Sequence, residues 1–129
     1  MSDFYRNKTL NELEGSLEEQ EFNSSLTKRC SDLRNKKLKD FDAGDIRVMI
    51  SQKMSLSYMI PIAIDMLAIN PFVEGDFYTA DLLVQVLQVD NEFWEKNEFL
   101  YYEFNEVIVD VKSTLELLLP VVMKFDSTK

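Results

Sequence analysis

Carboxylate side chains are concentrated in residues 74–110, where ten acids accompany a single base, Lys96. This stretch carries a charge of −9, which equals the formal net charge of the whole chain, because the other residues contribute 13 acids and 13 bases. A local excess of one sign creates a directional field, which attracts a basic partner and repels nucleic acid. The ten acids are Glu74, Asp76, Asp81, Asp90, Glu92, Glu95, Glu98, Glu103, Glu106 and Asp110.

Carboxylates at short spacing could also bind a metal ion. Glu74, Asp76 and Asp81 surround Gly75, but they do not have the spacing of an EF-hand. The alternative is a turn glycine flanked by acids near a helix N-terminus, where the helix dipole favours negative charge. We prefer this alternative and predict a structural turn and cap made of Gly75, Asp76, Thr79 and Asp81.

The chain contains no histidine and one cysteine, Cys30. The lack of histidine removes the commonest general base and the commonest metal ligand at neutral pH. Cys30 lies on an apolar helix face with Leu26 and Leu33, so we interpret it as a core residue rather than a nucleophile. We predict no catalytic residue, no metal and no cofactor. A hydrolase that uses carboxylates alone is the enzyme class left open, because the sequence does not show how far apart two carboxylates lie.

The single cysteine and the length of the apolar stretches indicate the cellular compartment. A lone cysteine cannot form an internal disulfide, which fits a reducing compartment, and we predict the cytoplasm. The longest apolar stretch, residues 59–68, is interrupted by Asp65 and is too short to span a membrane. We therefore predict no membrane partner and no signal peptide.

Helical spacing of apolar residues predicts the elements that position these side chains. The chain of 129 residues is about one domain, and three glycines with three prolines leave little room for β-turns. We predict an all-α fold, a single domain of about six helices over residues 1–129, with residues 1–8 and 126–129 frayed. The predicted helices cover residues 10–14, 25–35, 43–52, 56–69 and 80–88, a further short segment at 92–97, and a long helix from 98.

Short polar motifs mark the expected helix starts. Thr9 and Glu12 fit a capping box, Ser24 or Ser25 could cap the second helix, and Asp42 could cap the third. Residues 56–69 are almost entirely apolar and predict a buried central helix. Pro61 within it indicates either a kink or a true start near residue 60. Thr79 is the expected cap of the next helix and Asn91 that of the short segment.

The last helix contains a conflict between propensity and spacing. Residues 107–111 are rich in β-branched side chains and could form a strand. Apolar residues at three- and four-residue steps from Leu100 to Leu118 favour a helix, which we prefer. Pro120 is expected to end or kink it.

Aromatic side chains lie among the acids at the start of this helix. The five aromatics between residues 93 and 102 are more than one helix face can bury, although we expect most of them in the core. Tryptophan and tyrosine rimmed by charge are typical anchors of protein interfaces. The acids could also be ordinary solvated surface. The predicted partner-binding residues are Glu92, Trp94, Glu95, Glu98, Tyr101, Glu103, Glu106 and Asp110.

Several blocks of the sequence, taken in order, resemble a known protein family. They are KTLNELEG at 8–15, LKDF at 38–41, DIRVMISQ at 45–52, YMIPIA at 58–63, NPFVEGDFY at 70–78, DLL at 81–83 and FW at 93–94. Over residues 8–118 the chain resembles the immunity proteins of bacterial contact-dependent growth inhibition systems. It departs from the pattern at Lys37 and Ser57, where proline is expected, and at Thr79 and Ala80, where Pro-Gly is expected.

This resemblance implies a protein that is not an enzyme. Such proteins bind the C-terminal toxin domain delivered by a neighbouring cell, and nucleases are frequent among these toxins. A nuclease is basic where it meets phosphate, so an acidic inhibitor suits it. We therefore predict an immunity protein that neutralises one cognate, basic toxin domain and does not bind nucleic acid itself. The alternative is an acidic helical adaptor or regulatory protein with another basic protein partner.

Overall fold

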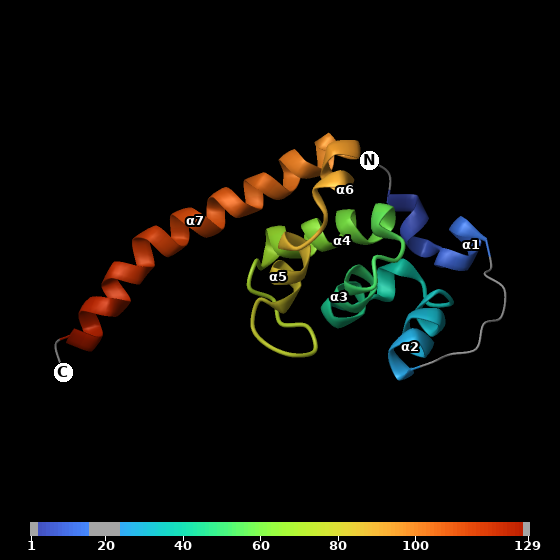
Figure 1. Ribbon diagram of the computed structural model, residues 1–129, viewed down its shortest axis with the longest axis horizontal. Helices are drawn as coiled ribbons and strands as arrows, with labels where there is room; N and C mark the ends of the chain where they lie inside the picture. Colours follow the sequence, from blue (N-terminus) through green and yellow to red (C-terminus); the bar gives the residue numbers. More distant parts are fainter. Residues whose placement is uncertain (1–2, 16–23, 128–129) are drawn as a thin grey trace.

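The computed structural model describes residues 3–15 and 24–127. Within these residues the chain forms seven α-helices and two short 3-10 helices, and it contains no strand (Figure 1). The all-α prediction is therefore confirmed. The α-helices are α1 (Leu10–Glu14), α2 (Ser25–Leu33), α3 (Ala43–Ser51), α4 (Leu56–Ile69), α5 (Asp81–Leu87), α6 (Asn91–Lys96) and α7 (Glu98–Ser127), and the 3-10 helices are Asp3–Asn7 and Leu38–Asp40.

Helix α4 lies at the centre of the fold, in contact with α3, α5 and α7. Its composition explains this position, because most of its residues are apolar and it buries side chains on more than one face. The helix begins at Leu56 and continues through Pro61, so the alternative start near residue 60 is wrong. Pro61 removes only one backbone hydrogen bond, and burial of the flanking isoleucines outweighs this loss.

Three helix starts are fixed by local side-chain hydrogen bonds, two of them at the residues that the sequence predicts. The side chain of Thr9 accepts from the Glu12 N–H, and the Asp42 carboxylate accepts from the Asp45 N–H at 2.8 Å. Ser24, one of the two candidates, caps α2. Each cap satisfies a backbone donor that the first helical turn leaves unpaired.

The N-terminal residues are more ordered than the sequence suggests. Residues Asp3–Asn7 form a 3-10 helix, and the Lys8 carbonyl accepts a hydrogen bond from the Leu38 N–H at 3.0 Å. Arg6 forms an ion pair with Asp65 of α4. The prediction that residues 1–8 are frayed is therefore wrong for residues 3–8, because these long-range contacts hold them. Residues 1, 2, 128 and 129 lie outside the described part of the chain.

Helix α7 is continuous from Glu98 to Ser127, so residues 106–111 are helical and Pro120 does not end the helix. Leu100, Phe104, Val107 and Val111 join the hydrophobic core, which explains why three- and four-residue spacing prevails over β propensity here. Beyond this stripe α7 projects away from the other helices (Figure 1).

The start of α5 differs from the prediction. Ala80, not Thr79, occupies the cap position, and no side-chain cap hydrogen bond forms there. The backbone of Ala80 is left-handed, with φ of 73°, because the preceding turn is held by the carboxylate of Asp81 instead. Asn91 is likewise the first residue of α6 rather than its cap, and its side chain donates to Glu95 at 2.8 Å.

Replacing Ala80 with glycine is expected to stabilise the protein by about 1 kcal/mol. A side chain in the left-handed region is strained by roughly 1–2 kcal/mol, and the loss of one methyl contact offsets part of the gain. The matched control is Ala68→Gly, on the exposed side of α4, which should destabilise by about 1 kcal/mol. Urea unfolding midpoints of both variants check this, and a loss of stability in both would refute the strain at Ala80.

Candidate protein-binding surface

The predicted partner-binding acids divide between two consecutive helices. Glu92 and Glu95 lie on α6, where Glu92 pairs with Lys96 at 2.9 Å and Glu95 accepts from Asn91. The other acids, Glu98, Glu103, Glu106 and Asp110, lie on α7. Within the described part of the chain no cation pairs with these four, so their charge is available to a partner.

One side of α7 combines acids with exposed aromatic rings. Phe99, Glu103, Glu106 and Asp110 follow each other at steps of four, three and four residues, and Tyr102 lies one turn before Glu106 on the same side. The Phe99 and Tyr102 side chains are 68% and 64% exposed, which is unusual for rings of this size. We call these five residues the acidic–aromatic strip.

Trp94 does not have the role that the sequence predicts for it. Its side chain is only 9% exposed and stacks on Phe104 of α7, with ring centroids 5.4 Å apart and planes at 2°. Trp94 therefore belongs to the core and cannot serve as an apolar anchor at the surface. Tyr101, the other predicted anchor, is 46% exposed and rests edge-on against Trp94 at 6.2 Å.

The expectation that most of the five aromatics are buried is also wrong. Phe99, Tyr101 and Tyr102 are exposed, because in this part of α7 the core stripe runs through Leu100 and Phe104. Sequence reasoning missed Phe99 and Tyr102 as surface residues. Their offset from that stripe was the signal that could have identified them.

The strip has the chemistry to recognise basic side chains. A carboxylate accepts charge-assisted hydrogen bonds from arginine or lysine, and an adjacent aromatic face attracts the same cation. Arginine fits best, because its planar guanidinium can bind the carboxylate and stack on the ring together. In the described part of the chain no group of three metal-ligating side chains comes together. The arrangement therefore favours binding of a basic protein surface.

The acids near Gly75 are engaged within the fold instead. Asp76 forms an ion pair with Arg29 at 2.7 Å, and the Asp81 carboxylate accepts the Phe77 N–H at 3.0 Å and also the Gly75 N–H. A Cβ on Gly75 would lie 2.8 Å from Asp81 Oδ1, so this close approach requires glycine. These contacts fasten the loop before α5.

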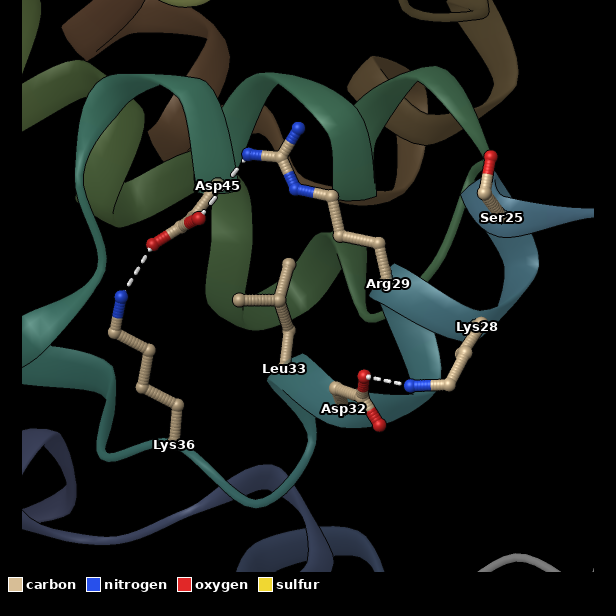
Figure 2. A pocket seen from close by; sticks show the side chains of 7 residues that line it. All are labelled: Ser25, Lys28, Arg29, Asp32, Leu33, Lys36 and Asp45. Atoms are coloured by element: carbon tan, nitrogen blue, oxygen red, sulfur yellow. Dashed lines mark hydrogen bonds and ion pairs between the residues drawn. The ribbon is translucent and has the colours of Figure 1, made fainter.

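Arg29, Lys36, Asp45 and Asp76 form an ion-pair cluster, in which Asp45 of α3 is the second carboxylate beside Asp76. Asp45 accepts from Lys36 Nζ at 2.7 Å and from Arg29 at 3.2 Å, and Figure 2 shows both contacts. Burial would raise the pKa of Asp45, but the bonds from Lys36, the Asp42 backbone and Arg29 outweigh it and hold the pKa below its usual range. The carboxylate is therefore a charged structural group.

A pocket of about 410 Å³ opens beside this cluster, between α2 and α3 (Figure 2). Its cations are already paired, Lys28 with Asp32 and Lys36 with Asp45, so little binding capacity is left for an anionic ligand. Cys30 of α2 is buried, as predicted, and burial raises the pKa of its thiol. We therefore place the candidate site on α7 and not in this pocket.

Comparison with known proteins gives one finding. A model of the family described as CDI immunity proteins matches residues 8–103, from the capping residues of α1 into the acidic–aromatic strip. No curated protein and no solved structure matches the chain. Among the described residues, no helix is long and apolar enough to cross a membrane.

Proposed function

The chain belongs to the CDI immunity proteins, those of contact-dependent growth inhibition, and we propose that it binds and neutralises one cognate toxin domain. It acts in the cytoplasm as a stoichiometric inhibitor rather than as an enzyme. The family match supports the immunity role. The acidic–aromatic strip supports the mode of action, because it offers unpaired carboxylates and exposed rings on a rigid helix.

The proposed toxin is a nuclease. A nuclease must present basic side chains where it binds phosphates, and a carboxylate can occupy those side chains in place of a phosphate. The three acids of the strip, Glu103, Glu106 and Asp110, form such a row along about two turns of α7. The negative field would also speed the encounter by steering the basic toxin toward α7.

The proposed contact surface extends from the strip to its neighbours. Glu98 and Tyr101 lie in the first turn of α7, and Glu92 and Glu95 lie on α6 directly before it. The bonds of Glu92 and Glu95 to Lys96 and Asn91 are on the surface, so they can be exchanged for bonds to a partner at little cost. Trp94 contributes from beneath by supporting the Tyr101 ring.

The alternative is an acidic helical adaptor that binds a different basic protein. The same strip fits that role, because its chemistry specifies a basic surface and not a toxin. The two proposals differ in how many partners bind and where their genes lie. An immunity protein has one dominant partner, which is encoded immediately upstream, whereas an adaptor serves partners without such linkage.

Capture of partners from the native host distinguishes an immunity protein from an adaptor. We expect the tagged chain to retain one dominant basic protein domain, and we expect that domain to cleave RNA or DNA once it is separated from the chain. A set of unrelated basic proteins with no toxin domain would favour the adaptor. A toxin domain without nuclease activity would keep the immunity function and refute the nuclease.

A further inference from the structure

The distal half of α7 presents an apolar surface that its own domain does not cover. Between residues 115 and 123 seven large apolar side chains are exposed, Leu117 at 77% and Val121 at 65% most of all. The others are Leu115, Leu118, Leu119, Val122 and Met123. Figure 1 shows this half of α7 extending away from the packed helices.

The apolar surface continues the stripe that α7 buries in its own core. Phe104, Val107 and Val111 face the domain, and Leu115, Leu118 and Val122 follow at the same three- and four-residue steps. The other exposed apolar residues flank this line on both sides. An apolar arc this wide is typical of a helix that is covered in its working state.

Charge is nearly absent from the same segment. Between residues 113 and 125 the only charged side chains are Glu116 and Lys124, which cancel. Interfaces with non-obligate partners are about as polar as the rest of the surface, whereas homodimer interfaces are more apolar. The composition of this segment is therefore that of a permanent interface.

We propose that the distal half of α7 pairs with the same segment of a second copy, forming a homodimer with two-fold symmetry. Each partly exposed apolar side chain offers roughly 100 Å² of apolar surface. The seven together offer roughly 700 Å², close to the ~800 Å² per partner of a standard interface. A self-complementary apolar face satisfies the symmetry requirement, because each copy supplies both halves of the contact.

The charge distribution also favours this partner. The net charge of −9 lies in residues 74–110, so two copies repel each other where these stretches meet and do not repel each other at the neutral segment 113–125. Pairing in opposite directions brings the neutral segments together and leaves the two acidic–aromatic strips at opposite ends. Both strips stay accessible to a basic partner, so the dimer does not depend on the proposed function.

Sedimentation equilibrium of the full chain at micromolar concentrations tests the proposal. The wild-type chain is expected to be a dimer, and Leu118→Glu/Val122→Glu is expected to raise the dissociation constant at least ~100-fold, because it places four charges in the interface. Both sites are already exposed, so the variant should fold, and circular dichroism should show unchanged helicity.

The matched control is Ile69→Glu/Leu87→Glu, which adds the same charges at exposed apolar sites on α4 and α5. This variant is expected to remain dimeric. A wild-type chain that stays monomeric at high micromolar concentration would overturn the proposal, even if α7 then bound lipid vesicles or a toxin domain. A dimer that persists in the α7 variant would overturn it equally.

Discussion

Reversal of Glu103, Glu106 and Asp110 to lysine is expected to weaken toxin binding about 100-fold or more at low salt. Each of the three carboxylates lies on the strip and pairs with no described cation, so the change acts on the partner and not on the fold. Like charges placed face to face cost several kcal/mol, and loss of steering lowers the association rate. The effect should therefore appear both as slower association and as faster dissociation.

Surface plasmon resonance at two salt concentrations measures this effect. Association of the wild-type chain should slow as salt rises, whereas association of the reversed variant should change much less. The control reverses Asp32, Asp40 and Glu74, which are exposed acids outside α6 and α7. Both variants have the same net charge, so only position distinguishes them. Equal affinity of the two folded variants would place the interface elsewhere.

The Asp81→Asn variant is expected to lose about 3 kcal/mol of stability and roughly 10 °C in Tm. Asp81 is 2% exposed, accepts backbone N–H groups of the preceding turn and lies 3.8 Å from Arg47 Nε. An amide supplies one acceptor in place of two and leaves Arg47 without its buried counter-charge. Asp32→Asn makes the same chemical change in an exposed pair with Lys28 and should cost under about 0.5 kcal/mol.

The stability difference between the wild type and Asp81→Asn should depend on pH in a defined direction. Burial would raise the pKa of Asp81, but hydrogen bonds from the Phe77 and Gly75 backbones and the charge of Arg47 hold it below its usual range. A lowered pKa means that the carboxylate stabilises the fold fully above about pH 4, and that this contribution is lost as the pH falls through the folded-state value.

Urea unfolding at pH 7, 5 and 3 checks this dependence. The gap between the wild type and Asp81→Asn should be constant from pH 7 to 5 and narrow at pH 3. The chain has no histidine, so no side chain with an ordinary pKa titrates between pH 5 and pH 7. A gap that widens in acid would mean that Asp81 is protonated in the folded state and does not pair with Arg47.

Local signals in the sequence were sufficient for most of the helices. The bounds of α4 and the capping boxes at Thr9 and Asp42 follow from apolar spacing and from hydrogen bonds spanning three residues. The failures involve side-chain and backbone contacts. The 3-10 helix at Asp3–Asn7 depends on a distant partner, Asp65, and the left-handed Ala80 depends on the hydrogen bonds of its neighbour Asp81, and apolar periodicity encodes neither contact.

The candidate site could be predicted only where its features depend on residues close together in the sequence. The acids of α7 could be placed on one helix because their spacing is local. The burial of Trp94 could not be predicted, because it depends on how α6 packs against Phe104 of α7. The ion-pair cluster was hidden as well, since Asp76 and Arg29 are 47 residues apart in the chain.

Titration of the captured toxin domain with this chain decides whether the protein neutralises its partner by binding it. With toxin well above the dissociation constant, RNA or DNA cleavage should fall linearly and reach zero at one copy of the chain per toxin domain. Each protomer carries its own strip, so this ratio holds whether or not the chain is dimeric. Cleavage that persists with the chain in several-fold excess would show that the chain does not inhibit this toxin.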